Sequence, residues 1–139
     1  EMRDAVRDVG GLYGEMRDRY VTDPEKVVYR PFHYVDLPGE WYRDSVVLIG
    51  DASHASTPQL AQGASMAMED AVVLGEEVAN GGSTADVLSR WQQRRFERAY
   101  WVASTSLRIC RAEANRESDP DIDVQKLMGE ARMRLMHPF

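Results

Sequence analysis

Apolar side chains recur every three to four residues in several stretches of this chain, a spacing that predicts amphipathic helices. The first stretch runs from Met2 to Tyr20, although the glycines within it weaken its helical tendency. The second begins near Gly63 and ends at the Asn-Gly-Gly segment 80–82, which supplies a C-terminal stop. A much longer helix is predicted to follow, with Ser83 or Thr84 as its N-terminal cap.

Within this long helix, apolar residues alternate in four- and three-residue steps, and we expect them to face a core or another helix. They are Phe96, Tyr100, Ala103, Leu107 and Cys110. The aromatic residues Trp91 and Trp101, like Phe96 and Tyr100, are interpreted as core or helix–helix contacts rather than as a stacking surface. Further along, the Asp-Pro-Asp segment 119–121 predicts a linker, and Val124 to Met136 predicts one more short helix.

Two other stretches favour β-strands. The β-branched and aromatic residues of 27–35 predict an edge strand or two short strands, because Pro31 cannot donate a hydrogen bond to a ladder. Ser45 to Ile49 forms a continuous apolar run, which is typical of a strand buried on both faces of a parallel sheet. The small and polar residues of 52–62 predict a loop after it.

The composition and the net charge of the chain indicate which kinds of molecule it can bind. The chain has 139 residues, 43% hydrophobic and 29% charged, which suits one globular domain with a hydrophobic core. Lys and Arg number 17 against 23 Asp and Glu, so the formal net charge is −6. This acidic balance argues against nucleic acid, because phosphate contacts require clustered cations. The basic run of Arg94, Arg95 and Arg98 beside Glu97 favours a solvated or salt-bridged helix face over a binding patch.

Cysteine content and hydropathy bear on the compartment. Cys110 is the single cysteine, so no internal disulfide can form, and its place on an apolar stripe is typical of a small buried residue. No apolar run approaches the roughly 20 residues that cross a bilayer. We therefore expect a soluble, cytoplasmic protein without a membrane span.

The segment from Val46 to Ala71 carries the clearest candidate chemistry. The predicted strand stops at Gly50 and presents Asp51 at its carboxyl end, where open α/β sheets bind ligands. Gly50 permits close backbone approach, and Asp51 can accept hydrogen bonds from sugar-like hydroxyl groups. The free N–H groups around Gln62, Gly63 and Ala64, at the start of the next helix, favour an anion.

This segment resembles the second flavin-binding motif of the para-hydroxybenzoate hydroxylase family of FAD-dependent aromatic-ring monooxygenases. That motif reads Gly-Asp-Ala-Ala-His, then a proline four residues later, then Gly-x-Gly opening a helix that contains Glu-Asp-Ala. Ser53 replaces the second alanine, Ser65 stands where asparagine is frequent, and Ala61 replaces the first glycine of Gly-x-Gly, a position where alanine takes positive φ poorly. The matching residues are Gly50, Asp51, Ala52, His54, Pro58, Gly63, Glu69, Asp70 and Ala71.

The resemblance implies FAD as cofactor, NADH or NADPH as reductant, and O2 as the source of an oxygen atom inserted into an activated aromatic or heteroaromatic small molecule. It implies that Asp51 binds the ribityl hydroxyls and that the loop around Pro58 lines one side of the isoalloxazine. It also implies that the N–H groups at the following helix start face flavin N1 and the C2 carbonyl. No catalytic residue and no metal site is assigned. The cofactor-binding candidates are Gly50, Asp51, Pro58, Ala61, Gln62, Gly63 and Ala64.

The implied fold class is α/β: the C-terminal part of a Rossmann-like FAD-binding domain, with one or two strands from the substrate domain and a mostly helical tail. Residues 1–44 would end the substrate-binding domain, 45–82 would form the FAD-binding strand–loop–helix, and 83–139 the C-terminal helices. The family's Gly-x-Gly-x-x-Gly and Asp-Gly motifs do not occur in this sequence. We therefore expect roughly the last third of a family member, inactive alone, which forms a homo-oligomer or associates with the missing N-terminal part.

Several residues allow more than one interpretation. A loop-bracing His54 is favoured over a proton-transferring one, and Glu69 and Asp70 favour helix-surface charge or sheet packing over a catalytic carboxylate pair. Sheet packing is likewise favoured over substrate contact for Tyr29, His33 and Tyr34. Two other functions stay open: a related FAD-dependent reductase or halogenase, and a non-catalytic helical binding module that keeps the flavin-site scaffold.

Overall fold

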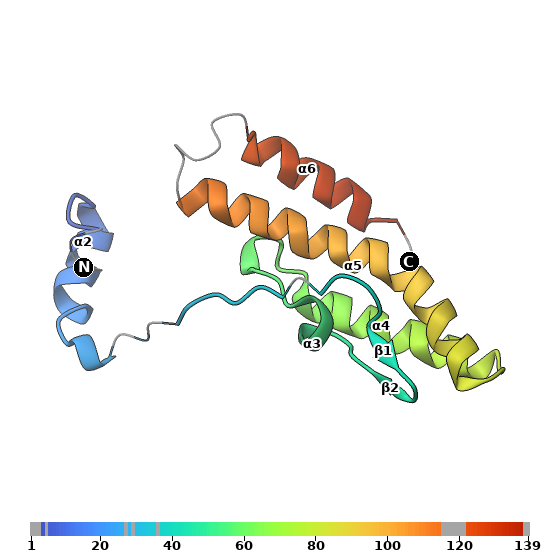
Figure 1. The fold of residues 1–139 in the computed structure, drawn as a ribbon. Coiled ribbons are helices and arrows are strands. Elements are labelled where there is room, and N and C mark those ends of the chain that lie inside the picture. The colour runs from blue at the N-terminus through green and yellow to red at the C-terminus, as the bar shows by residue number, and fades with distance from the viewer. Residues whose placement is uncertain are drawn as a thin grey trace. The chain divides into compact units, whose positions relative to one another are not determined.

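The computed structural model describes residues 4, 6–26, 28, 30–35, 37–114 and 122–137. The chain forms two compact units, residues 1–31 and residues 32–139. The first unit contains helix α2, Gly11–Tyr20, and the short 3-10 helix η1, Pro24–Lys26 (Figure 1). The second unit holds the described elements from β1 to α6 and the two hydrophobic cores.

Helix α2 is shorter than the sequence predicts. It begins at Gly11, whose φ is +62°, and Met2 lies outside the described residues. The preceding turn is held by Arg17, which donates to the carbonyl oxygens of Val6 at 3.0 Å and Arg7 at 2.6 Å. Residues 6–8 therefore form a turn rather than part of a helix, and Gly10 and Gly11 separate this turn from the body of α2, because glycine has a low helix propensity and takes positive φ without strain.

The second unit is built on a helical hairpin. Helix α4, Gly63–Ala79, and the 31-residue helix α5, Thr84–Ala114, lie side by side, and α6, Val124–Leu135, packs along α5 (Figure 1). Before α4 in sequence the chain forms an antiparallel ribbon of β1, Tyr42–Arg43, and β2, Val46–Val47, in which Tyr42 pairs with Val47. The one-turn helix α3, Asp51–His54, and the 3-10 helix η2, Pro58–Leu60, connect the ribbon to α4.

The helix boundaries have local causes that the sequence predicts correctly. Gly81 and Gly82 follow α4 with φ of +74° and +112°, a conformation that ends a helix and that glycine adopts readily. Ser83 then caps α5: its Oγ accepts from the Asp86 amide at 3.2 Å, while the Ser83 amide donates to Asp86 Oδ2 at 3.3 Å. The predicted last helix is confirmed as α6, and Asp123 accepts from the Lys126 amide at 3.0 Å to cap it.

Two groups of buried side chains stabilise this unit. One joins α4, α5 and α6 through Met66, Val102, Ile109 and other residues, and the second surrounds Trp41 and Trp91. Both tryptophans are almost completely buried, and each indole N–H finds an acceptor: Trp41 donates to the Leu37 carbonyl at 2.9 Å and Trp91 to the Asp70 carbonyl at 3.0 Å. The predicted core role of Trp91 is therefore confirmed.

The buried face of α5 differs from the predicted apolar stripe. Tyr100 is 40% exposed and stacks on Phe96 at the surface, whereas Ala103 is buried as expected. The face that α5 buries includes the polar residues Arg95 and Ser106, both fully buried. A prediction based on the spacing of apolar residues misses these buried positions, because it assigns charged and hydroxyl side chains to the solvent-exposed face.

The strand predicted at 27–35 is not formed by the described residues, and the strand predicted at 45–49 is too long. The described residues of 27–35 form no strand, and of these Val35 donates a backbone hydrogen bond to the Ala55 carbonyl at 3.0 Å. In the run Ser45 to Ile49, only Val46–Val47 is a strand, and Val46 is 67% exposed. Its partner is β1 in an antiparallel ribbon, and the described part of the chain supplies no parallel neighbour that would bury both of its faces.

The arrangement among the described residues is thus mostly helical with one two-stranded sheet, and it contains no Rossmann-like parallel sheet. The predicted loop 52–62 includes two single turns, the end of α3 and η2, because short helical turns satisfy its backbone groups locally. The predicted linker at 119–121 lies outside the described residues. None of the described helices combines the length and apolar character required to cross a membrane.

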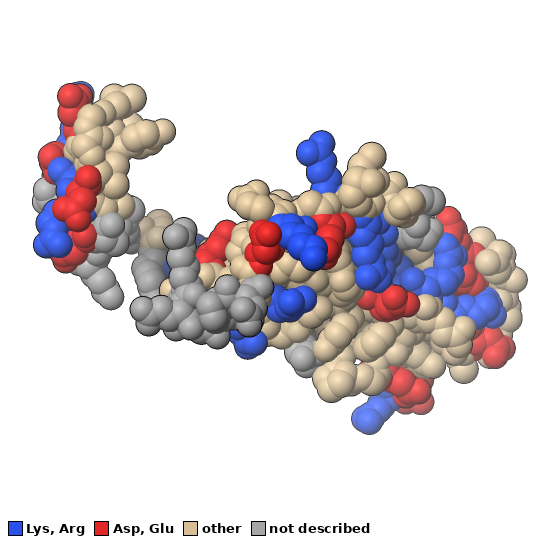
Figure 2. Space-filling view, turned by 90° about the horizontal axis from the view of Figure 1, so that it is seen from above, with Lys and Arg blue, Asp and Glu red and all other residues tan. Residues whose placement is uncertain are grey.

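Charged side chains of both signs alternate along the helices of the second unit. Figure 2 shows Lys and Arg side chains interleaved with Asp and Glu side chains on the face in view. Ion pairs join Arg94 to Glu76 at 2.7 Å and Arg134 to Glu97 at 3.0 Å. The predicted salt-bridged helix face is confirmed for Arg94, whereas Arg95 is buried rather than solvated.

Candidate functional site

A cavity of about 640 Å³ lies between the end of β2, the turns of α3 and η2, and the N-terminal part of α4. Ile49 and Ala67 contribute apolar surface to its wall. The structure brings every cofactor-binding candidate of the sequence to this cavity. These residues are Gly50, Asp51, Pro58, Ala61, Gln62, Gly63 and Ala64.

Gly50 makes the turn that begins the site. Its φ is +56° and its ψ is −135°, a conformation that non-glycine residues rarely adopt. Its carbonyl oxygen accepts from the amides of Ser53 at 3.0 Å and His54 at 2.9 Å, and its amide donates to Asp70 Oδ2 at 2.9 Å. The amide and the carbonyl of Gly50 are therefore both satisfied without the use of the next side chain, Asp51.

The Asp51 side chain is exposed at the edge of the cavity, as the first residue of α3. Within the described ranges its carboxylate forms no hydrogen bond or ion pair. An ionised carboxylate has two acceptor oxygens, so Asp51 can accept hydrogen bonds from hydroxyl groups of a ligand.

The opposite wall of the cavity is the turn 57–61, and Ser106 of α5 holds it in place. Ser106 Oγ donates to the Thr57 carbonyl at 2.5 Å and accepts from Thr57 Oγ1 at 3.1 Å and from the Leu60 amide at 3.4 Å. Ser106 and Thr57 are both buried. Ser106 thus binds the turn that contains Pro58 at three points, and Glu113 of the same helix accepts from Gln59 Nε2 at 3.2 Å.

Ala61 ends this turn in the left-handed conformation, with φ of +52° and ψ of +33°. Its amide donates to the Pro58 carbonyl at 2.9 Å. The position where the motif commonly has glycine therefore keeps the backbone geometry that favours glycine, and alanine adopts it at a cost.

The N-terminus of α4 is the donor end of the cavity. Gln62 precedes the helix without forming a side-chain cap, and the first helical hydrogen bond is donated by Met66 to the Gln62 carbonyl at 2.9 Å. The amides of Gly63 and Ala64 therefore have no acceptor within the helix, and both residues line the cavity. Together with the dipole of a 17-residue helix, they favour negative charge at this point.

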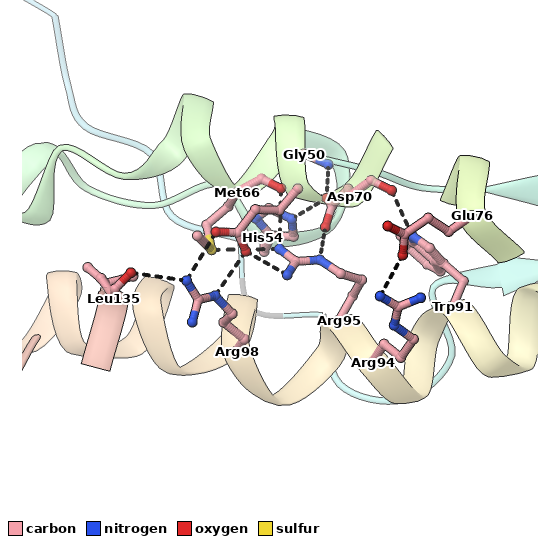
Figure 3. A network of polar contacts seen from close by, with 11 residues as sticks. Gly50, His54, Met66, Asp70, Glu76, Trp91, Arg94, Arg95, Arg98 and Leu135 are labelled. Carbon is pink, nitrogen blue, oxygen red and sulfur yellow. Dashed lines mark hydrogen bonds and ion pairs between the residues drawn. The ribbon is translucent and has the colours of Figure 1, made fainter. Parts of the chain in front are cut away.

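A buried network of charged side chains lies behind the cavity, between α4 and α5 (Figure 3). Asp70 is fully buried; its Oδ2 accepts from the Gly50 amide at 2.9 Å and lies 2.7 Å from His54 Nε2, and its Oδ1 accepts from Arg95 Nε at 2.8 Å. Glu69 accepts from Arg95 Nη1 at 2.7 Å and from Arg98 Nε at 2.9 Å. The two carboxylates are balanced by the two arginines.

This network corrects the sequence interpretation of Glu69 and Asp70 as helix-surface charges or as residues packed against a sheet, because both pair with arginines of helix α5. Their exposed fractions are 9% and 0%, because Arg95 and Arg98 of the neighbouring helix neutralise them. Hydrophobic periodicity could not reveal these pairs. A weak signal was present nonetheless: an acidic pair on one helix and a basic run on the next, joined by the short loop of a helical hairpin.

Two opposing effects set the protonation of Asp70. Burial raises the pKa of Asp70, but hydrogen bonds from His54, the Gly50 amide and Arg95 outweigh burial and hold this pKa below its ordinary value. Asp70 is therefore an ionised carboxylate at neutral pH, and all its hydrogen-bond partners act as donors.

His54 is 4% exposed and does not line the cavity. Its ring lies 5.3 Å from the ring of Trp41, and its Nε2 bonds to Asp70. This arrangement agrees with the predicted bracing role. Of the residues weighed for substrate contact, His33 is exposed, Tyr34 is half-buried, neither lines the cavity, and Tyr29 lies outside the described residues.

Comparison with known proteins gives a family for this site. The model of the FAD binding domain matches residues 35–106, a stretch that contains the entire cavity wall. The chain belongs to the FAD binding domain family. Its mostly helical arrangement with a small two-stranded sheet is consistent with part of such a domain. No solved structure gives a significant match.

Several curated proteins are similar to this FAD binding domain chain. The Bacillus subtilis (strain 168) protein YetM, which carries the provisional name of an FAD-dependent monooxygenase, is 34% identical over 91% of the chain and 34% of its own length. The 3-amino-4-hydroxybenzoate 2-monooxygenase of Streptomyces cremeus is 30% identical over 73% of the chain and 27% of its own length. The FAD-dependent urate hydroxylase of Klebsiella oxytoca is 36% identical over 55% of the chain and 20% of its own length. The chain thus spans about a third or less of these relatives.

Proposed function

We propose that this chain supplies the part of a flavin site that holds the ribityl chain and the isoalloxazine of FAD. The complete protein would be an FAD-dependent monooxygenase that uses NAD(P)H and O2 to hydroxylate an aromatic or heteroaromatic small molecule. The observation that carries the proposal is the convergence of the Asp51 carboxylate and the N-terminus of α4 on one cavity. The monooxygenase and hydroxylase names of the relatives support the reaction class.

The residues present fit the cofactor. A ribityl chain requires acceptors for its hydroxyl groups, which the unpaired Asp51 carboxylate can provide. The N1 and C2 carbonyl side of a flavin requires donors, which the amides of Gly63 and Ala64 can provide. The cavity volume of about 640 Å³ lies within the range of small-molecule sites, roughly 300–1,000 Å³. Gly50, which lines the cavity, has no side chain that would occupy part of it.

FAD supplies the redox chemistry when bound, and the chain's residues bind and orient it. Asp51 accepts hydrogen bonds from the ribityl hydroxyls. The amides at Gly63 and Ala64, aligned with the dipole of α4, stabilise negative charge on the N1 and C2 carbonyl side of the ring. The turn 57–61, which Ser106 contacts, would line one side of the ring.

The same proposal covers the organisation of the chain. Residues 1–44 end the substrate-binding part, 45–82 form the cofactor-binding segment, and 83–139 are the supporting helices. The exposed apolar residues Val46, Leu48 and Ile49 would be covered by the remainder of the protein or by a second copy of it. The complete protein would act in the cytoplasm on an activated ring, with NADH or NADPH as reductant.

The test is an absorbance spectrum of the purified full-length protein, with and without added FAD. Bands near about 370 and 450 nm should accompany the protein, as for a bound flavin. Asp51→Ala should weaken FAD binding by about tenfold or more, because it removes charged hydrogen bonds. Glu97→Ala removes the same charge from an 87% exposed side chain on α5 and should bind FAD like the wild type.

If the full-length protein is colourless and takes up no added FAD, the proposed function is wrong. If it binds FAD, oxidation of NADH and NADPH should be measured with phenols and heteroaromatic hydroxy compounds. Stimulation of NAD(P)H oxidation together with a hydroxylated product would support the monooxygenase reaction. If the protein binds flavin but oxidises neither NADH nor NADPH in the presence of these substrates, the proposed cofactor site would be supported and the proposed reaction would be refuted.

A further inference from the structure

We propose that Asp70 and His54 are positioning residues of the flavin site, which hold the turn 50–54 so that the Asp51 carboxylate stands at the cavity. This inference rests on the proposed function, because the ligand that Asp51 would meet is the flavin's ribityl chain. Neither Asp70 nor His54 lines the cavity, so each acts through the turn rather than by contact with the cofactor.

One carboxylate oxygen, Asp70 Oδ2, contacts both ends of the turn 50–54. Asp70 Oδ2 accepts from the Gly50 amide at 2.9 Å and lies 2.7 Å from Nε2 of His54. Asp51 stands between these two attachment points and has no hydrogen bond of its own among the described residues. Its direction is therefore set by the turn, and the turn is held by Asp70.

The turn also closes on itself. The Gly50 carbonyl accepts from the amides of Ser53 and His54 and from Ser53 Oγ at 3.1 Å. Ser53 is 1% exposed and His54 is 4% exposed. The segment thus moves as one body, so a change at the Asp70–His54 contact is expected to displace Asp51 rather than only the histidine ring.

Asp70 itself is rigidly placed. Arg95 Nε donates to its Oδ1 at 2.8 Å, and Trp91 Nε1 donates to its backbone carbonyl at 3.0 Å. Arg95 is also fully buried and bonds to Glu69 and to the Met66 carbonyl (Figure 3). Residues of α4 and α5 together therefore fix the position of Asp70, and through Asp70 they fix the turn 50–54 at the edge of the cavity.

The histidine could instead matter only for packing, since its ring lies 5.3 Å from that of Trp41. Two substitutions separate these roles. His54→Gln keeps an N–H donor near the position of Nε2 but loses the ring. His54→Leu keeps apolar bulk beside Trp41 but provides no donor to Asp70. A positioning hydrogen bond predicts that Gln is tolerated better than Leu, and a packing role predicts the reverse order.

The experiment measures the dissociation constant for FAD in the full-length protein, by titration of the apoprotein. His54→Leu should weaken binding about tenfold, and His54→Gln should stay within about threefold of the wild type. Glu76→Gln, an exposed carboxylate on α4 that pairs with Arg94, serves as the control and should leave the constant unchanged. An equal effect of Leu and Gln, or a larger effect of Gln, would overturn the proposal.

A double-mutant cycle tests whether His54 acts through Asp51. In an Asp51→Ala background, His54→Leu should weaken FAD binding by less than about twofold, because the group that it positions is gone. If the His54→Leu effect is undiminished in that background, the histidine does not act through Asp51 and the proposal is wrong. The flavin absorbance bands of each variant provide a second readout of the ring environment.

Thermal unfolding of each variant shows whether it folds. If His54→Leu does not fold, His54→Phe keeps a ring beside Trp41 without the donor and takes its place with the same expectation. If both fail to fold while His54→Gln folds, the hydrogen bond serves the fold and the positioning proposal is overturned. Wild-type protein that binds no FAD would refute the proposed function, whereas binding that is indifferent to His54 and sensitive to Asp51 would refute only this inference.

Discussion

The backbone of Gly50 lies directly against the side chain of Ala67: a Cβ placed on Gly50 would stand 3.0 Å from the Ala67 Cβ. Ala67 belongs to the second turn of α4, and both Gly50 and Ala67 line the cavity. This contact brings two parts of the cavity wall together. Glycine at one position and a small residue at the other are both required for it.

Gly50→Ala should destabilise the full-length protein by about 3 kcal/mol, since it adds both a steric contact and a strained φ of +56°. Urea unfolding followed by circular dichroism would measure it. Gly75→Ala is the matched control: Gly75 lies within α4, and its added Cβ would meet nothing within 4 Å. It should stabilise by about 0.5–1 kcal/mol. Equal effects of the two substitutions would contradict the close approach at Gly50.

Ala61→Gly should stabilise the protein by about 0.5–1 kcal/mol, because it relieves the left-handed conformation of Ala61 by more than it adds to the entropy of the unfolded chain. The same chemical change at Ala71, an exposed position inside α4, should destabilise by about 1 kcal/mol. Thermal unfolding midpoints should therefore move in opposite directions. A loss of stability on Ala61→Gly would show that the left-handed turn carries no strain.

Asp70→Asn should reduce the free energy of unfolding by about 3 kcal/mol, because it leaves the buried Arg95 and the half-buried Arg98 with a single carboxylate between them. The amide also cannot accept from the Gly50 amide, His54 and Arg95 together. Glu76→Gln breaks an ion pair whose side chains are 52% and 36% exposed, and it should cost less than about 0.5 kcal/mol. Comparable losses in the two variants would refute the importance of the buried network.

Glu77 should contribute to the acid stability of the helical hairpin. Hydrogen bonds from Arg90 and then Arg94 lower the pKa of Glu77 from 4.5 to about 2. A carboxylate with a depressed pKa in the folded state stabilises the protein above its unfolded pKa and loses that contribution as the pH falls through the folded value. The difference in melting temperature between wild type and Glu77→Gln should therefore be full above about pH 4.5 and vanish towards pH 2.

The control for this pH series is Glu97→Gln, which breaks the exposed ion pair with Arg134 and should show a small difference at every pH. Asp70 and the other carboxylates titrate in both proteins, so their effects cancel in the comparison. A wild-type advantage over Glu77→Gln that persists unchanged at pH 2 would contradict the assigned cause of the shift.

Local sequence determined helices α4, α5 and α6 and their ends, but not the start of α2. The Gly81-Gly82 stop and the Ser83 cap depend on backbone conformations and hydrogen bonds within a few residues, so the sequence predicts them directly. The spacing of Gly50, Asp51, Pro58 and Gly63 was likewise sufficient to identify the segment around the cavity. Turn conformations and motif spacing depend on residues close together in the sequence, so they can be predicted without knowledge of the tertiary structure.

Only the tertiary structure decided which charged and polar residues are buried. Arg95 and Asp70 lie 25 residues apart in sequence and are both fully buried, because each neutralises the other across two helices. Ser106 holds the Thr57 turn from 49 residues away. Periodicity assigns such residues to solvent, since the free energy of burying a charge or hydroxyl depends on a partner whose position the sequence pattern does not contain. For the same reason the exposed faces of Val46 and its neighbours could not be foreseen: burial of a strand depends on the layers packed against it, and not on the strand's own residues.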